Sequence, residues 1–462
     1  MTSKFYDKIT VPVILSILLI GAAIKFKFLF QGSLWPDEAL YLYIARNLSA
    51  DLTNLTDNSG NFFYHSPPLL MYLLSLVEWV RGIEFDQAAR IVVILMGMGT
   101  VLTVYFIGKK IYHPLAGIVA ALFMAVCPLS NWTGVRILND VPVTFFIYLA
   151  VCMLVYEKNK AFYFFALCAA LTKYSAILVF FLPLFMRMKP RTWTSLYLGG
   201  LAALFAFGLT SHFFPKPNGW LGYFYSFVHL PNTLHMVKET EFFIGYFIFA
   251  FAVLGMFLTI RERKFSALFH WICIYGICRI FFPWIIFRVS RYTLPLYPGI
   301  YLLAAYACYR SVQIVASKWP VYTKWAKLFF IVAIASVLFQ HTVRSLGMLE
   351  QTRNMFTGFD KACAFLVKQP GPHSVATASP RQIKYHAPEF EVHDIWKNIS
   401  PEGFKEFLEK EQIQYVSIDF WSPHLPDWCR SYDYRKNGYD LIYGEKNVYV
   451  FKALKKGFGT GR

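Results

Sequence analysis

The feature that most restricts how this chain can fold is a succession of long apolar segments. Eleven runs of mostly apolar residues alternate with short polar stretches, and most approach the roughly twenty residues that a helix needs to cross a bilayer. The strands of a membrane barrel would be about ten residues long and would alternate in polarity. We therefore expect a polytopic α-helical membrane protein with about 11 transmembrane segments. The runs fall at 11–30, 89–108, 114–130, 141–156, 161–172, 174–186, 194–214, 242–260, 267–285, 292–309 and 328–342.

The composition supports this class of protein. Only 16% of the 462 residues are charged and 56% are hydrophobic, whereas about 25% of residues are charged in soluble domains. The net charge of +18 could suggest a nucleic-acid partner. However, the basic residues lie between the apolar runs rather than in one patch. They instead predict the orientation of the chain in the membrane.

The orientation depends on residues 67–83, an apolar run that carries Glu78 and Arg81. If this run lies along the membrane surface, every basic loop falls on the same side as Lys4 and Lys8; if it crosses the membrane, those loops move to the other side. We therefore expect a juxtamembrane helix there and a cytoplasmic N-terminus, in the plasma or inner membrane of the cell. The basic loop residues are Lys109, Lys110, Lys158, Lys160, Arg187, Lys189, Arg191, Arg261, Arg263, Lys264, Arg310, Lys318, Lys324 and Lys327.

The sequence divides into two predicted domains. Residues 1–342 form the membrane domain, whose first outer loop, 31–89, is rich in acidic residues. Residues 343–462 are mixed in polarity, and their alternation of predicted elements indicates a small α/β domain on the extracytoplasmic side. In that domain we expect strands at 373–378, 413–420 and 446–452 and helices at 356–369 and 401–411.

Two further patterns bear on the outer face. Cys363 and Cys429 lie in the predicted α/β domain, where they would either form a disulfide or remain two free thiols. Four matches to the N-glycosylation pattern would also lie outside if the orientation is right. These matches are at Asn47, Asn54, Asn131 and Asn398.

The first candidate site lies at residues 34–48, LWPDEALYLYIARNL. The apolar residues of this stretch recur at helical spacing, so a helix is predicted with Asp37 as its N-cap and Glu38 beside it. Both carboxylates would lie where the helix dipole favours negative charge. Capping alone would explain Asp37. The other interpretation is that the two acids form one wall of an active site at the outer membrane face.

Other polar residues are predicted at the same face. His65 precedes two prolines that suit the first turn of a helix, and Asp140 opens an apolar run, where it could be a catalytic acid or an ordinary cap. Lys173 separates two short apolar runs. If these runs form a hairpin, Lys173 lies within the membrane, where an ionisable residue is usually functional; one long tilted helix is the alternative. Arg288 and Arg291 lie at the outer end of a later run.

Carboxylates beside cations at a membrane surface suit the transfer of a sugar from a lipid phosphate. Cations can hold the phosphate leaving group, and a carboxylate can take the proton from an attacking hydroxyl or amine. An acid catalyst is not needed, because phosphate leaves as an anion. Fixed placement of donor and acceptor would supply much of the rate.

Five motifs in order resemble the GT-C superfamily of polyprenyl-phosphate-dependent glycosyltransferases. They are LWPDE with YIARNL, HSPPLLMYLL, NDVPVTFF, LTKYSAILVFFLP and SRYTLPLYPGIYLLAAYA. The chain is most similar to the branch that contains protein O-mannosyltransferases and the aminoarabinose transferases of lipid A, over residues 5–340. The resemblance implies that Asp37, with Glu38 beside it, is the base or the acceptor-orienting acid and that Asp140 is a second acid. It also implies that Lys173 and Arg291 meet the lipid phosphate.

The resemblance sets the expected reaction and partners. We expect an inverting single displacement that moves a sugar from a polyprenyl-phosphate donor to a protein, lipid or glycan acceptor at the extracytoplasmic face. His65 stands where relatives often have a lysine, so it would bind substrate as a cation only near neutral or lower pH. This branch implies no metal, so no cofactor is expected to be required, although use of a divalent cation stays open. A flippase of lipid-linked glycans and an inactive relative that acts as a binding partner are the alternatives.

Overall fold

The computed structural model describes most of the chain and divides it into two compact units. The helical unit comprises residues 1–29, 66–70 and 90–349, and the sheet unit comprises 30–65, 71–89 and 350–462. For 3–9, 230–243, 279–281 and 290, only the backbone is described. The described residues are 3–30, 32–57, 59–63, 66–80, 82–188, 192, 230–281, 290–353, 355–369, 373–395, 399–420, 422 and 425–454.

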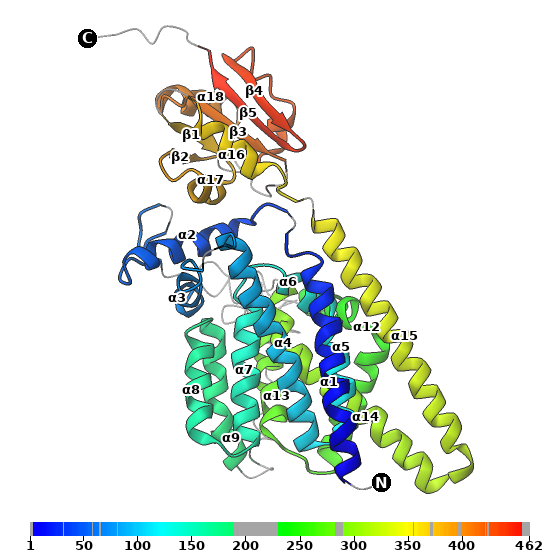
Figure 1. Ribbon diagram of the computed structural model, residues 1–462. Helices are drawn as coiled ribbons and strands as arrows, with labels where there is room; N and C mark the ends of the chain where they lie inside the picture. The colour runs from blue at the N-terminus through cyan, green and yellow to red at the C-terminus, as the bar shows by residue number, and fades with distance from the viewer. Residues whose placement is uncertain are drawn as a thin grey trace. The chain divides into compact units, whose positions relative to one another are not determined.

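The helical unit is a bundle of helices of very different lengths (Figure 1). The chain breaks several of them at proline or glycine, as at Gly245, whose positive φ of 76° interrupts α12. Such a φ value is easily adopted by glycine, which has no Cβ. The helices are α1 (Ser3–Phe26), α4 (Phe85–Ile111), α5 (Pro114–Ala125), α6 (Pro128–Gly134), α7 (Asp140–Val155), α8 (Asn159–Ala170), η1 (Tyr174–Phe181), α9 (Leu182–Arg187), α12 (Leu230–Arg261), α13 (Ala267–Phe281), η2 (Ser290–Leu296), α14 (Tyr297–Lys318), η3 (Pro320–Tyr322) and α15 (Thr323–Arg353).

Four helical stretches among the described residues are long and apolar enough to cross a membrane, or five if the bent pair α5 and α6 counts as one span. The pair bends by 54°. Other predicted spans occur as shorter apolar helices, such as α7 and the stretch Thr10–Phe26, and the run 194–214 lies outside the described residues. The prediction of about 11 segments is therefore not confirmed. The four stretches are Phe85–Ile111, Ile244–Arg261, Arg291–Lys318 and Pro320–Arg353.

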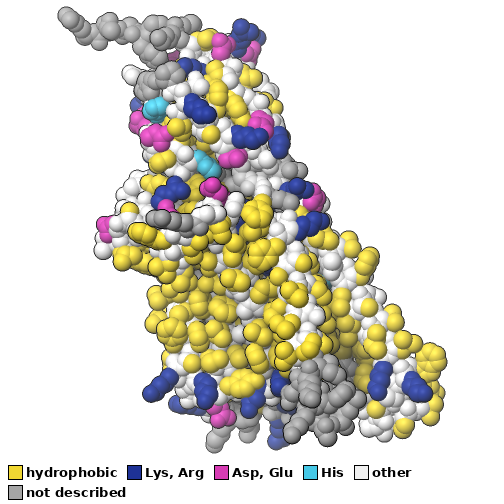
Figure 2. Space-filling model, in the orientation of Figure 1, with side chains coloured by type: hydrophobic (Ala, Val, Ile, Leu, Met, Phe, Trp, Pro, Cys, Tyr) yellow, Lys and Arg dark blue, Asp and Glu magenta, His cyan; other side chains and the backbone are white. Residues whose placement is uncertain are grey.

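Basic loops meet at one end of the helical unit, where Figure 2 shows Lys and Arg side chains below a face covered by hydrophobic ones. Polar contacts join the loops there. Arg310 Nη2 lies 2.6 Å from Glu262 Oε1, and Lys264 Nζ donates to Tyr306 Oη at 3.1 Å. The rings of Tyr112 and Tyr306 stack with centroids 4.1 Å apart. The ends of α4, α12 and α14 therefore lie together, as the charge pattern predicted.

The two short runs on either side of Lys173 form a hairpin. Lys173 has an extended backbone, with φ −154° and ψ 130°, so one continuous helix through 161–186 is excluded. The returning segment ends near the basic loops, because the ring of Phe185 lies 6.0 Å from that of His270 in the first turn of α13. The hairpin interpretation is confirmed, and the turn that carries Lys173 lies at the opposite end from those loops.

A buried lysine links three helices of this unit. Lys25 lies in the last turn of α1 with no exposed surface, and its Nζ donates to Asn131 Oδ1 at 2.5 Å. Asn131 Nδ2 in turn donates to Ser345 Oγ of α15 at 3.1 Å. A Cβ at Gly134 would lie 2.8 Å from Lys25 Cε, so a glycine there makes room for the lysine. Asn131 is wholly buried, so its match to the N-glycosylation pattern does not present an accessible site; Asn398 lies outside the described residues.

The sheet unit contains a five-stranded mixed sheet in the order β2-β1-β3-β5-β4. Strand β1 is parallel to β2 and β3, and β5 is antiparallel to β3 and β4. The strands are β1 (Ser374–Thr377), β2 (Glu391–Asp394), β3 (Tyr415–Asp419), β4 (Tyr439–Glu445) and β5 (Val448–Ala453). The helices are α2 (Pro36–Ala50), α16 (Phe359–Val367), α17 (Pro380–His386), α18 (Pro401–Lys410) and η4 (Asp427–Arg430).

The predicted α/β character and all three predicted strands are confirmed. Sequence analysis missed β2, β4 and α17, because β2 is four residues long with polar ends and β4 is only half-buried. The predicted helix at 67–83 is shorter than expected: α3 spans only Leu69–Ser75, and turns follow it.

The two cysteines of the sheet unit are free thiols. Cys363 packs in a cluster with Phe359 and Val375, whereas Cys429 packs in another cluster with Val416 and Phe404. Alternate residues of β1 and β3 supply the two clusters, so the cysteines lie on opposite faces of the sheet. Of the two alternatives left open above, the structure supports free thiols.

Candidate active site

The first turn of α2 carries the two acids singled out in the sequence. The helix begins at Pro36, so its N-cap is Trp35 and the predicted cap at Asp37 is wrong. The reason is that proline suits the first helical position, where no N–H is needed. Glu38 is fully buried, and its Oε2 accepts a hydrogen bond from Trp35 N at 2.9 Å. Glu38 therefore satisfies the helix start, and Asp37 is not needed for capping.

Asp37 forms an ion pair within the sheet unit. The Nη1 atom of Arg381, on the first turn of α17, lies 2.8 Å from Asp37 Oδ1. The side chains of Asp37 and Arg381 are 31% and 39% exposed, so both remain accessible to a substrate. Sequence reasoning missed Arg381, because 344 residues separate it from Asp37.

A second contact fixes α2 against α17. The guanidinium carbon of Arg46 lies 4.7 Å from the ring centroid of Tyr385, and Nη2 donates to Tyr385 Oη at 3.3 Å. Arg46 Nε also lies 3.3 Å from Glu78 Oε1. Burial raises the pKa of Tyr385 to about 12, so its hydroxyl stays neutral near pH 7. These contacts hold α2 between residue 78 and the helix that carries Arg381.

The helical unit contains the other predicted acid and two predicted cations in one cluster. Asp140 is the first residue of α7 and is buried. Lys173 Nζ lies 2.7 Å from Asp140 Oδ1, and Arg291 Nε lies 3.5 Å from Asp140 Oδ2. Both oxygens of this carboxylate therefore face cations. One negative and two positive charges leave the cluster with a net charge of +1, which suits an anionic ligand.

Neighbouring residues complete the cluster. Lys173 Nζ lies 3.2 Å from the ring centroid of Tyr292, a cation–π contact that sequence analysis missed. Asn139 Nδ2 donates to Ser66 Oγ at 2.6 Å, and Ser66 Oγ donates to the carbonyl of Thr172 at 3.4 Å. Residues next to predicted site residues in the sequence thus tie the turn at Lys173 to the start of α7.

Two predicted substrate-binding residues cannot be compared with this geometry. His65 and Arg288 lie outside the described residues. Among the residues that the structure describes, no three His, Cys, Asp or Glu side chains are grouped so that they could hold a metal ion.

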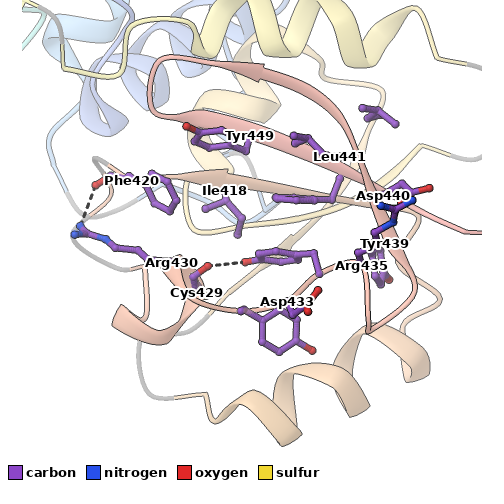
Figure 3. A pocket seen from close by; sticks show the side chains of 14 residues that line it. Ile418, Phe420, Cys429, Arg430, Asp433, Arg435, Tyr439, Asp440, Leu441 and Tyr449 are labelled. Carbon is purple, nitrogen blue, oxygen red and sulfur yellow. Dashed lines mark hydrogen bonds and ion pairs between the residues drawn. The ribbon is translucent and has the colours of Figure 1, made fainter.

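The sheet unit also contains a cavity of about 840 Å³, shown in Figure 3. The rings of Phe420 and Tyr449, with centroids 5.3 Å apart, supply part of its aromatic lining. Its charged residues have partners in the protein: Arg435 Nε lies 3.4 Å from Asp440 Oδ1, and Arg430 Nη2 donates to the carbonyl of Phe420 at 3.5 Å. Among the residues that the structure describes, none of those predicted for the site lines this cavity. Asp37 and the Asp140 cluster therefore remain the candidate site residues.

One protein family matches part of the chain. Residues 65–213 match the family described as dolichyl-phosphate-mannose-protein mannosyltransferase. This stretch includes Asp140 and Lys173. No curated protein matches the chain.

Several solved structures have a similar fold. ArnT from Cupriavidus metallidurans bound to undecaprenyl phosphate is 14% identical, with 98% of this chain and 99% of that chain covered and a TM-score of 0.55. The archaeal oligosaccharyltransferase AglB from Archaeoglobus fulgidus, in complex with an inhibitory peptide and a dolichol-phosphate, is 12% identical, with 97% and 75% covered and a TM-score of 0.60. The arabinofuranosyltransferase AftD from Mycobacteria is 14% identical, with 96% and 40% covered and a TM-score of 0.53.

Proposed function

We propose that this chain, which belongs to the GT-C superfamily by its motifs, family match and fold, transfers a sugar from a polyprenyl-phosphate donor to an acceptor. The observation that carries the proposal is the buried carboxylate of Asp140 held between Lys173 and Arg291. The family match names a lipid-phosphate sugar donor, and two similar structures contain a polyprenyl or dolichyl phosphate. The proposed location is the cell membrane, with the N-terminus cytoplasmic and the sheet unit extracytoplasmic.

In this proposal the two cations bind the phosphate of the donor. Arginine can contact phosphate oxygens with two N–H groups, and lysine adds a compact positive charge. Asp140 is a positioning residue, because its oxygens face the two cations and so hold them side by side. The cations stabilise the charge that develops on the leaving phosphate.

Asp37 is the proposed base. An acceptor hydroxyl or amine attacks the anomeric carbon from the side opposite the phosphate, which inverts the configuration. The proton of the attacking group passes to the Asp37 carboxylate, and the electron pair of the broken C–O bond leaves with the phosphate. The products are a glycosylated acceptor and a free polyprenyl phosphate. Glu38 serves the helix start rather than the reaction, because it is buried and bonded to Trp35 N.

Native mass spectrometry of the full chain in mild detergent tests the donor. We expect a retained polyprenyl phosphate, or its glycosylated form, because a lipid phosphate at a cationic cluster dissociates slowly from a protein that also binds its chain. The mass would give the sugar and the chain length together. If the purified protein repeatedly carries ordinary phospholipids only, the result would contradict the proposal. Movement of a lipid-linked glycan between leaflets of proteoliposomes, without transfer, would favour the transporter alternative.

Transfer is expected to continue without added divalent cation. In the proposed site Lys173 and Arg291 supply the positive charge that a metal ion supplies in metal-dependent transferases. The measurement compares the transfer rates of the protein before and after dialysis against a chelator. As a control, chelator is added directly to the assay to show whether the chelator itself disturbs the measurement. Complete loss that manganese restores would show that a metal is required.

A further inference from the structure

We propose that Arg381, on α17 of the sheet unit, is a positioning residue for Asp37 and that holding this carboxylate is one role of the C-terminal domain. The inference rests on the function proposed above and deepens it. Its basis is the 2.8 Å contact between Arg381 Nη1 and Asp37 Oδ1. Arginine is always charged, and it holds a carboxylate in a defined direction.

The contact belongs to a built interface within the sheet unit. On the chain leading into α2, Ser33 Oγ donates to Asp360 Oδ1 at 2.9 Å, and the rings of Trp35 and Phe356 meet edge to face at 5.8 Å. Later on α2, Arg46 contacts Tyr385 one turn after Arg381 on α17. Residues of the segment 356–385 thus contact the chain at α2 both before and after Asp37.

The direction of the Asp37 carboxylate depends on contacts of the side chain itself. The backbone of the turn is fixed by Pro36 and by the bond from Trp35 N to Glu38, whereas the rotamer of a partly exposed aspartate is set by its side-chain partners. The ion pair with Arg381 fixes the direction of one carboxylate oxygen. A partly exposed ion pair contributes little to folding, so its loss should affect the rate of reaction far more than the stability of the protein.

The variant Arg381→Gln tests the inference, because it keeps the size and polarity of the side chain and removes the charge. We expect kcat to fall about 10- to 100-fold, the scale of a small misplacement of a catalytic group, with KM for the lipid donor unchanged. Arg381→Lys should recover part of the loss, because its ammonium keeps the charge but not the planar fork. Hydrogen exchange of the peptide covering 34–45 should become faster in Arg381→Gln.

Lys361→Gln is the matched control. Lys361 forms a 2.8 Å ion pair with Glu445 in the same unit, and its removal should leave both kcat and exchange at 34–45 at the wild-type values. A wild-type kcat in Arg381→Gln, beside an inactive Asp37→Asn, would overturn this inference alone. So would a faster Arg381→Gln enzyme, or an equal loss in Lys361→Gln. Full activity of Asp37→Asn would overturn the role of base proposed for Asp37, whereas the absence of sugar transfer by the wild-type protein would overturn the proposed function itself.

Discussion

Replacement of Asp37 by asparagine is expected to lower the rate of sugar transfer by about 10²- to 10⁴-fold, the usual contribution of a general base. Asparagine keeps the shape of the side chain and can still meet Arg381, but its amide does not accept the proton of the acceptor. The protein should remain folded, because the start of α2 depends on Pro36 and Glu38. The measurement is the transfer rate of purified protein with a polyprenyl-phosphate sugar, together with its thermal unfolding in detergent.

Glu38→Gln is the matched control for this experiment, since it makes the same chemical change at the next residue. Glutamine at this helix position can still accept the bond from Trp35 N. We therefore expect Glu38→Gln to transfer sugar at close to the wild-type rate. Normal turnover in Asp37→Asn together with a loss in Glu38→Gln would show that Glu38, and not Asp37, is the base.

Replacement of Lys173 by methionine should lower kcat/KM for the lipid donor by about 10²- to 10³-fold, the range found when one group that stabilises developing charge is removed. Methionine has a similar length but no charge, so of the two cations proposed to bind the phosphate Arg291 alone would remain. Stability should also fall, by about 1–3 kcal/mol, because the buried Asp140 loses its 2.7 Å partner and keeps the one at 3.5 Å.

A double variant separates the two effects. Lys173→Met combined with Asp140→Asn removes one charge of each sign, so the cluster keeps its net charge. The buried Asp140 carboxylate, which would otherwise have lost its lysine partner, is then absent as well. We expect thermal stability to return toward the wild-type value while kcat/KM stays low. Recovery of transfer in the double variant would show that Lys173 serves only to neutralise Asp140, which would contradict its proposed contact with the donor phosphate.

The local patterns of the sequence predicted much of this structure. The start of α2 was predicted two residues too late, with the cap at Asp37 instead of Trp35, because Asp is a common cap while the effect of Pro36 was underestimated. The hairpin at Lys173 followed from two runs too short to cross a membrane singly. The strands β1, β3 and β5 followed from apolar runs that are now buried in the sheet.

The missed features depend on contacts between distant parts of the chain. Asp140, Lys173 and Arg291 were each proposed as site residues, but nothing in their spacing indicated that one carboxylate would face both cations. Arg381 lies in a helix of seven residues that carries no sequence signal of its own. Its importance depends on the packing of α17 against α2, which the sequence of either helix alone does not contain.

The buried Lys25 has a consequence for how the protein is made. Its acceptor, Asn131, is 106 residues further along the chain, so α1 is synthesised well before that acceptor exists. In the meantime a lysine in the last turn of an apolar helix can extend its amine to polar surroundings. It can turn inward only when α6 arrives beside it. The packing of α1 is therefore completed only after α6 has been synthesised, because α6 supplies the acceptor for the buried Lys25 amine.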